Sequence, residues 1–327
     1  MNVIEVKNLC KTFKTTKKVK GFKNKLKNLF KKKEVNIKNA VNDISFSVEE
    51  GEALAFIGPN GAGKSTTIKM LTGILFPTSG EISVLGYNPS KQRTKLSYEV
   101  GTVFGQKEQL WVHLSPLDNF IFFGNIYDIP KKELMARIDE LATLFDIKDY
   151  IEQPVKSLSL GQRMKCEMVA SLLHKPKMLF FDEPTIGLDP IAKETLRNLI
   201  KKINRELGTT ILFTSHDVGD IEEVCKRVII INDGKIVLDD SMRNLKYHYL
   251  NKKIVEVNLK KDIRIPKSDG ITVLEAKDTV YKIEVDMNKK TMDDLLGLFK
   301  AEDLQDISIS STPLEDIIKD IYRGKNE

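Results

Sequence analysis

A glycine-rich loop between a short apolar run and a helical pattern constrains this sequence more than any other feature. The loop, GPNGAGKS at Gly58–Ser65, matches the pattern G-x-x-x-x-G-K-[ST]. It follows the apolar run Ala53–Ile57, which predicts a buried strand, and it opens the helical pattern of Ser65–Leu71. Glycines let successive backbone N–H groups point into one concavity, and the N-terminus of a following helix adds positive partial charge. The sequence therefore predicts a strand–loop–helix unit that holds phosphate groups, rather than an ordinary glycine-rich turn.

Two carboxylates at the end of another apolar run extend this candidate site. Asp182 and Glu183 directly follow Met178–Phe181. A strand that is apolar on both faces belongs in the middle of a parallel sheet, and such sheets bind ligands at the carboxyl ends of their strands. We expect Lys64 to reach the β- and γ-phosphates of a nucleotide, and Ser65 and Asp182 to hold Mg²⁺. We expect Glu183 to orient or deprotonate an attacking water.

Short apolar runs alternate with helical patterns over residues 39–240, which predicts a parallel sheet with crossover helices. Alternation over residues 1–13 predicts one more strand, and Asn232–Gly234 predicts a hairpin turn that leads into Lys235–Leu238. The runs that fit buried strands are Ala53–Ile57, Val100–Phe104, Met178–Phe181, Thr210–Thr214 and Val228–Ile231.

The pattern changes after about residue 241, where no chemical motif is recognisable. The stretches that predict strands are Ile254–Leu259, Ile271–Glu275, Val280–Val285 and Ile307–Ser311. Those that predict helices are Thr291–Lys300 and Pro313–Tyr322. The chain is thus expected to divide into a domain over residues 1–240 and a small α+β domain over residues 241–327.

A third motif lies between the glycine-rich loop and Asp182. The stretch LSLGQ at Leu158–Gln162, followed by the helical pattern of Arg163–Leu173, resembles the signature of the ATP-binding cassette (ABC) family, with Leu160 where the commonest form has glycine. The resemblance covers residues 1–240. It implies an α/β fold, a P-loop NTPase of the ABC type with a parallel sheet core, an antiparallel β subdomain and a helical subdomain.

The resemblance also implies roles for individual residues. Gln106 resembles the family's glutamine that contacts Mg²⁺ and the water, although Gly105 adds a residue before it and Gln109 is an alternative. His216 resembles the switch histidine, and Phe13 resembles the aromatic residue that stacks on adenine. The implied ATP-binding residues are Phe13, Gly58, Pro59, Asn60, Gly61, Ala62, Gly63, Lys64, Ser65 and Thr66. The implied catalytic residues are Glu183, His216 and Gln106, and the implied metal ligands are Ser65, Gln106 and Asp182.

In this family a second copy of the chain completes each site. Ser159 and Gly161 would contact the γ-phosphate bound by the partner, while Gln162 and Asp189 would line the interface. A single copy of each motif implies a homodimer with C2 symmetry and two ATP molecules between the subunits. ATP would favour closure because its γ-phosphate is contacted from both sides, and hydrolysis would remove that contact. The chain is therefore expected to be an ATP hydrolase that uses ATP and Mg²⁺.

The resemblance also indicates which process ATP hydrolysis would power. Gln106 and Ser159 lie only 53 positions apart, so there is no long coiled-coil insertion, as in chromosome-maintenance or DNA-repair relatives. The sequence also shows no second cassette, as the family's translation factors have. The chain resembles a transporter ATPase subunit of drug, viologen or polysaccharide exporters, whose permease is a separate chain. The aromatic stretch Leu110–Tyr127 would then form a groove for a cytoplasmic helix of the permease. The alternative is that these aromatic residues belong to an ordinary helical core. An importer subunit and a soluble regulatory or nucleic-acid-handling ATPase are the alternatives.

Composition limits where such a protein acts. Hydrophobic residues make up 41% of the chain and charged residues 30%, which is ordinary for a globular protein. No apolar run reaches the roughly 20 residues that span a bilayer, and no signal peptide is recognisable. The three cysteines, Cys10, Cys166 and Cys225, fit neither a disulfide framework nor a zinc site. We expect a cytoplasmic protein held at the inner face of the cell membrane through its permease.

The positive charge of the chain is concentrated in one insert. Lys14–Lys38 holds eleven lysines and one acid, so it carries +10, while the whole chain carries +6. This distribution argues against a broad nucleic-acid surface, and no nucleic-acid partner is expected. Apolar residues within 19–30 lie on one helical face, and such a basic amphipathic helix can lie on an anionic membrane surface. It could equally pack against the permease, or form a solvated loop.

Overall fold

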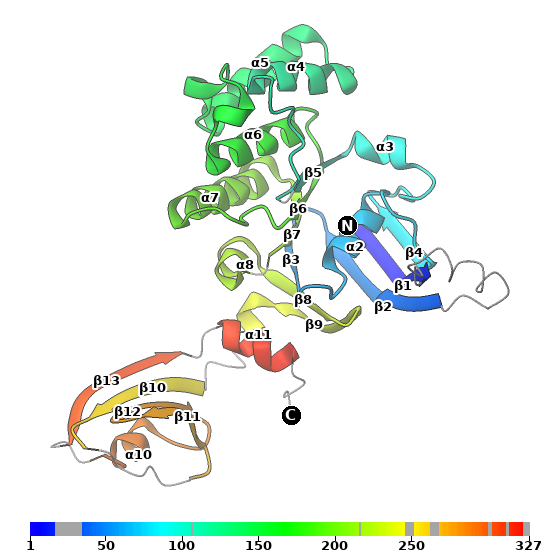
Figure 1. Ribbon diagram of the computed structural model, residues 1–327. Helices are drawn as coiled ribbons and strands as arrows, with labels where there is room; N and C mark the ends of the chain where they lie inside the picture. Colours follow the sequence, from blue (N-terminus) through cyan, green and yellow to red (C-terminus); the bar gives the residue numbers. More distant parts are fainter. Residues whose placement is uncertain are drawn as a thin grey trace, which may run out of the picture. The chain divides into compact units, whose positions relative to one another are not determined.

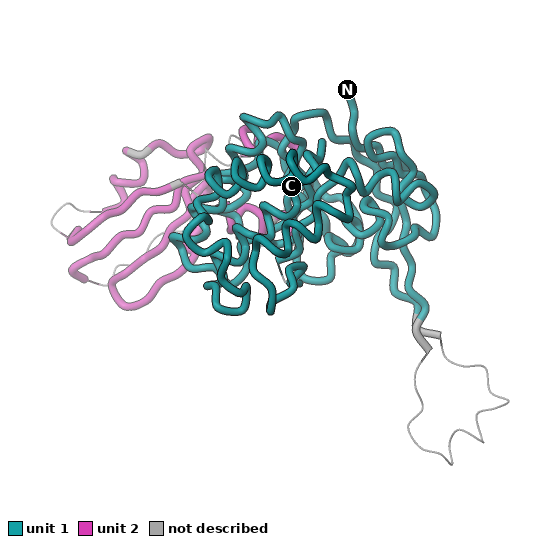
Figure 2. Tube along the Cα trace, turned by 90° about the horizontal axis from the view of Figure 1, so that it is seen from above, with its two compact units in different colours: residues 1–239 teal, residues 240–327 magenta. Residues whose placement is uncertain are grey.

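The computed structural model describes residues 1–16, 35–105, 107–215, 217–245, 252–261, 268–299, 303–311 and 314–322. Two compact units make up the chain, Met1–Asp239 and Asp240–Glu327 (Figure 2). Gln106, His216 and the segment 17–34, which includes the amphipathic stretch 19–30, lie outside the described residues.

A six-stranded sheet forms the core of the first unit. Its strand order is β5-β6-β7-β3-β8-β9, and the pairs from β5 to β8 are parallel. The strands are β3 (Ala53–Ile57), β5 (Val100–Phe104), β6 (Met178–Asp182), β7 (Thr210–Thr214), β8 (Arg227–Asn232) and β9 (Lys235–Ser241). All five residues of β3 and of β7 are buried, as expected for strands covered on both faces.

A three-stranded antiparallel sheet, of order β2-β1-β4, lies beside this core (Figure 1). Its strands are β1 (Asn2–Thr16), β2 (Val35–Glu49) and β4 (Ser79–Val84). The prediction that the strand ends at residue 13 and that the insert spans 14–38 is wrong at both ends. Lys14 pairs with Ile37 and Thr16 with Val35, because β1 and β2 continue their hairpin ladder into the lysine-rich stretch.

Helices complete the first unit, and α4, α5 and α6 contact one another as a helical subdomain (Figure 1). The helices are α2 (Lys64–Leu71), α3 (Arg93–Ser97), α4 (Pro116–Ile126), α5 (Lys131–Leu144), α6 (Leu160–Leu172), α7 (Pro190–Leu207) and α8 (Val218–Val224). The fold expected from the motifs is confirmed: a parallel core, an antiparallel sheet and a helical subdomain.

The second unit is a four-stranded antiparallel sheet of order β11-β12-β10-β13. Its elements are β10 (Lys252–Leu259), β11 (Ile271–Lys277), β12 (Val280–Asp286), α10 (Met292–Leu296), β13 (Leu304–Ser311) and α11 (Leu314–Tyr322). The helix expected over Thr291–Lys300 is shorter, because Thr291 caps its start and Gly297 ends it. Within the described ranges, no helix combines the length and apolar character needed to cross a membrane.

Candidate active site

The loop between β3 and α2 needs glycine for two different reasons. A Cβ on Gly58 would lie 2.2 Å from the carbonyl oxygen of Ile231, so the loop packs too closely for any side chain. Gly63 has φ +115° and would place a Cβ 2.5 Å from the carbonyl oxygen of Ala40. No side chain caps the start of α2, so its first N–H groups remain available to a ligand in the cradle.

Lys64 places its ammonium group inside this loop. The residue is 5% exposed, and Nζ donates to the carbonyl oxygen of Gly58 at 2.6 Å. Nζ also lies 3.9 Å from Oε1 of Glu183. Burial lowers the pKa of Lys64, while the charges of Glu183 and Asp182 oppose that shift. A buried cation beside backbone N–H groups is suited to phosphate oxygens.

The structure brings Ser65 and Asp182 together, although they lie 117 positions apart in the sequence. Ser65 Oγ donates to Asp182 Oδ1 at 3.1 Å, and Thr214 Oγ1 donates to the same oxygen at 2.7 Å. A hydroxyl and a carboxylate are the hard oxygen donors that Mg²⁺ prefers, usually together with waters and substrate phosphates. The donor set therefore fits this metal. Among the described residues, no three His, Cys, Asp or Glu side chains gather into an all-protein metal cage.

Glu183 follows Asp182 in a backbone conformation that is rare for a side-chain-bearing residue. Its φ is +54°, and its N–H donates to the carbonyl oxygen of Thr214 at 3.0 Å. Such strained residues gather at functional sites. A Cβ on Gly105 would lie only 1.9 Å from the carbonyl oxygen of Glu183. The extra glycine before Gln106 thus allows the end of β5 to contact the backbone of Glu183 directly.

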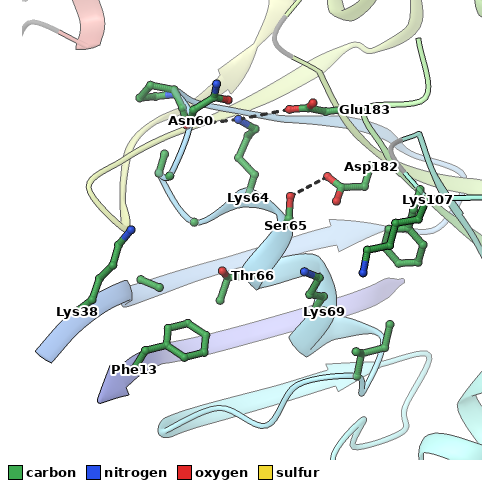
Figure 3. Close-up of a pocket in the computed structure, with 17 residues that line it drawn as sticks. Phe13, Lys38, Asn60, Lys64, Ser65, Thr66, Lys69, Lys107, Asp182 and Glu183 are labelled. Atoms are coloured by element: carbon green, nitrogen blue, oxygen red, sulfur yellow. Dashed lines mark hydrogen bonds and ion pairs between the residues drawn. The ribbon is translucent and has the colours of Figure 1, made fainter. Parts of the chain in front are cut away.

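These residues line one cavity of about 410 Å³ (Figure 3). All eight expected nucleotide-contacting residues from Pro59 to Thr66 line it, as do Phe13, Asp182 and Glu183. Gly58, also expected to contact the nucleotide, does not line the cavity and packs against Ile231. Lining residues that the sequence did not single out are Lys38, Ala40, Lys69, Ile74, Phe104 and Lys107.

The phenylalanine end of the cavity is built by the β1–β2 hairpin. Phe13 pairs with Lys38 across the two strands, and its side chain is 37% exposed. Lys11 Nζ lies 5.3 Å from the centre of the Phe13 ring and donates to the carbonyl oxygen of Phe76 at 2.6 Å. The lysine therefore lies within cation–π distance of the ring and is also bonded to the backbone at Phe76. Lys38 reaches the cavity because the strand register pairs it with Phe13. No local sequence motif marks this position.

The signature residues begin a helix, three residues earlier than the expected start at Arg163. Ser159 is the N-cap of α6, and its Oγ accepts the N–H of Gln162 at 3.2 Å. Gln162 Oε1 accepts the N–H of Ser159 at 2.9 Å, which completes a capping box. Asp189 is the N-cap of α7, where its side chain accepts the N–H of Ala192 at 2.9 Å. None of Ser159, Gly161, Gln162 and Asp189, all within the described part of the chain, lines the cavity.

A buried carboxylate joins the loop after Glu183 to the strand end before His216. Asp220 is 0% exposed and accepts from three side chains. Thr185 Oγ1 and Ser215 Oγ donate to Oδ2, the latter at 3.2 Å, and Arg197 Nη1 donates to Oδ1 at 3.1 Å. The sequence offered no signal for this network, which fixes two loops of the site to one another.

Comparison with known proteins identifies this arrangement. The family model described as ABC transporter matches residues 41–186. The ABC transporter ATP-binding protein NatA of Bacillus subtilis (strain 168) is 34% identical over 206 residues, which are 63% of this chain and 83% of NatA. The chain belongs to the family of ABC transporter ATP-binding proteins. It is accordingly an ABC ATPase, which binds and hydrolyses ATP as the ATP-binding subunit of a transporter.

The chain is also similar to a second transport protein and to a solved structure. The bacitracin transport ATP-binding protein BcrA of Bacillus licheniformis is 31% identical over 246 residues, covering 75% of this chain and 77% of BcrA. The structure of cbiO1 from Clostridium perfringens, described as part of the ABC transporter complex cbiONQ, has a TM-score of 0.63 and 26% identity. That match covers 75% of this chain and 90% of cbiO1.

Proposed function

We propose that this ABC ATPase powers export by a separate integral membrane permease, and that it works as a homodimer with two ATP molecules at the interface. One observation carries the dimer. Lys64, Ser65, Asp182 and Glu183 converge on one cavity, whereas Ser159 of the same chain caps a helix that does not line it. A second copy would supply the missing contacts to the γ-phosphate.

Within one half-site, each residue would have a distinct task. The backbone N–H groups of the loop and the Lys64 ammonium would bind the β- and γ-phosphates. Ser65, Asp182 and Gln106 would hold Mg²⁺, which would supply positive charge for the phosphate oxygens. Glu183 would orient the attacking water and accept its proton. The short polar network around Asp182 and Thr214 would keep these groups aligned during turnover.

The partner residues would act at the γ-phosphate. Ser159 Oγ accepts one hydrogen bond in the cap, so its own O–H remains able to donate. Gly161 would approach with its backbone, while Gln162 and Asp189 would shape the interface through their caps. His216 would stabilise the same phosphate from the cavity's own chain. Leu160, which is 43% exposed, would replace one backbone approach by an apolar contact.

The direction of transport and the docking surface complete the proposal. Similarity to BcrA, a bacitracin transport protein, supports a drug-type exporter, with an importer subunit as the alternative. Trp111 is 56% exposed and its ring centroid lies 4.8 Å from that of Phe122, which is 38% exposed. We propose that this aromatic surface receives a cytoplasmic helix of the permease. The ATPase would thereby sit at the inner face of the cell membrane.

The decisive experiment uses Glu183→Gln. This variant should bind ATP but lose turnover by about 10²–10⁴-fold, since an amide cannot accept the water proton. With MgATP it should accumulate as a dimer in sedimentation, whereas Lys64→Ala should stay monomeric. Normal hydrolysis by E183Q would refute the role of Glu183. Single subunits with MgATP, both alone and with a co-purified polytopic membrane protein, would refute the dimer.

A further inference from the structure

The segment that follows Gln106 is held by side chains instead of by a regular backbone ladder. We call Lys107–Trp111 the linker, because it leads from β5 into the helical subdomain. The N–H groups of Gln109 and Leu110 both donate to one oxygen, Oε1 of Glu167 on α6, at 2.9 and 3.1 Å. One carboxyl oxygen thus satisfies two consecutive peptides of the linker.

Two more side chains fasten the linker on either side of that contact. The Arg163 guanidinium of α6 pairs with Glu108. Asn119 of α4, which is 0% exposed, accepts the N–H of Trp111 at 2.8 Å and donates to its carbonyl oxygen at 3.2 Å. Every residue from 108 to 111 is therefore bonded to α4 or α6. The linker and the helical subdomain form one hydrogen-bonded body.

Glu167 is an unusual residue to find in this place. It is only 6% exposed, and its second oxygen, Oε2, has no hydrogen-bond partner in the part of the chain that the structure describes. Burial raises the pKa of this carboxyl, which the two backbone N–H groups oppose. Burying a carboxyl group with one oxygen unsatisfied costs free energy, and packing alone would favour an apolar side chain. We therefore attribute the presence of Glu167 to its hydrogen bonds with the N–H groups of Gln109 and Leu110.

The position of Glu167 on α6 shows what that contact connects. Glu167 lies six residues after Gly161 on an uninterrupted helix, a distance of about 9 Å along the axis. The same helix begins at the Ser159 cap. At the other end, the linker carries exposed Trp111. Glu167 therefore connects the linker to α6, the helix whose first turn holds the signature residues.

We propose that Glu167 is a positioning residue that couples the linker to the signature residues, so that movement at the aromatic surface and movement of Ser159 and Gly161 occur together. The inference rests on the proposed function, in which Ser159 and Gly161 act on nucleotide bound by the partner. The coupling acts through the reach of a hydrogen-bond acceptor at position 167. Negative charge at that position is not needed.

Two conservative variants distinguish the position of the acceptor oxygen at residue 167 from its negative charge. Glu167→Gln keeps an oxygen at the same reach and removes the charge, whereas Glu167→Asp keeps the charge and withdraws the oxygen by one methylene. E167D should lose about 10-fold or more in kcat, because small misplacements of reacting groups have large effects on rate. E167Q should stay within about twofold of the wild type. Both should bind ATP with unchanged Kd, since neither touches the cavity.

The only tryptophan of the chain supplies a spectroscopic readout in the linker itself. Addition of MgATP should change Trp111 emission in the wild type and in E167Q, in parallel with dimer formation. In E167D the emission change should no longer follow the dimerisation curve. Glu140→Gln is the matched control, because Glu140 pairs with Arg137 in the same subdomain without touching the linker.

Two results would overturn the proposal. One is E167D at wild-type kcat, and the other is E167Q impaired as much as E167D or more. Failure of the proposed function would be visible separately, because the wild type would then show no hydrolysis, or E183Q no dimer. A wild type that dimerises and hydrolyses ATP, with equal activity in E167D and E167Q, would refute the coupling alone.

Discussion

The two compact units build β-sheets in opposite ways. In the first unit, strands such as β3 are buried throughout, and the polar groups of the site lie at the last residue of a strand, as Asp182 does, or just after it. In the second unit, Tyr281, Ile283 and Val285 of β12 are buried, and the residues between them are partly exposed. One sheet is covered on both faces, and the other has one face on a core and one toward solvent.

This difference explains where the chemistry collects. Parallel strands place all their carboxyl ends at the same edge, so the loop after β3, Gly105 after β5 and Asp182 at the end of β6 meet there. Antiparallel strands alternate in direction, and their loops are divided between two edges. We therefore expect substitutions in the first unit to change catalysis, and those in the second to change mainly its own stability.

Among the substitutions that compare the two units, the largest effect should come from Lys64→Ala. Loss of a buried ammonium from the phosphate loop should weaken ATP binding by about 10- to 10²-fold, since a charge-assisted hydrogen bond contributes roughly 1.5–3 kcal/mol. Titration calorimetry with MgATP measures it. The matched change in the second unit, Lys277→Ala on β11, should leave the affinity unchanged. Equal losses in the two variants would contradict the assignment of the site to the first unit.

Gly105→Ala tests whether backbone contact sets the catalytic spacing. The added Cβ would overlap the carbonyl oxygen of Glu183, so the two loops must separate. We expect kcat to fall about 10²-fold while ATP affinity changes little. Gly208→Ala is the control, because Gly208 also resists a side chain, through φ +63°, but lies outside the cavity. Comparable rate losses in both would mean that the effect comes from stability.

Ile283→Ala should damage the second unit alone. Ile283 is 0% exposed in the core of that unit, and its truncation should destabilise it by about 2–5 kcal/mol. Urea unfolding should show the transition of the second unit moving to lower concentration, with the ATP Kd unchanged. Ile309→Ala, at a position 45% exposed, should move it by about 0.5 kcal/mol or less. A weakened ATP affinity in I283A would show that the two units are not independent.

The smallest effect should come from Lys38→Gln. Lys38 lines the cavity from β2, so its charge should add to phosphate binding by a few-fold at low salt. The affinity of K38Q should therefore fall less with added salt than that of the wild type. Lys14→Gln removes a charge from the same hairpin but not from the cavity and should have no such effect. If both variants behave alike, the hairpin acts only through its overall charge.

Much of the catalytic sheet could be predicted because its strands are apolar without interruption. The expected bounds of Ala53–Ile57, Val100–Phe104 and Thr210–Thr214 are those of β3, β5 and β7. The approach of Asp182 to Ser65 also followed from the rule that parallel strands end at one edge. The order of motifs gave the family, which the comparisons confirm.

Contacts that depend on distant pairing could not be predicted. The ends of the β1–β2 hairpin are rich in lysine, which hides their alternation, so Lys38 was assigned to the insert and not to the cavity. Glu167 and Asp220 each sit in a helical pattern as ordinary polar residues. Only the folded chain shows that their partners are a linker and two loops. The S-x-x-Q spacing of Ser159 and Gln162 was a readable sign of a helix start.

Backbone hydrogen bonds join the ends of β5, β6 and β7, and they determine how the catalytic centre unfolds. The Gly105 N–H donates to the carbonyl oxygen of Asp182 at 2.9 Å, and the Glu183 N–H donates to that of Thr214 at 3.0 Å. These amide hydrogens can exchange with deuterium only when neighbouring strand ends separate. On gradual heating, deuterium uptake there should therefore begin with opening of the whole sheet, well after the exposed helix ends have exchanged.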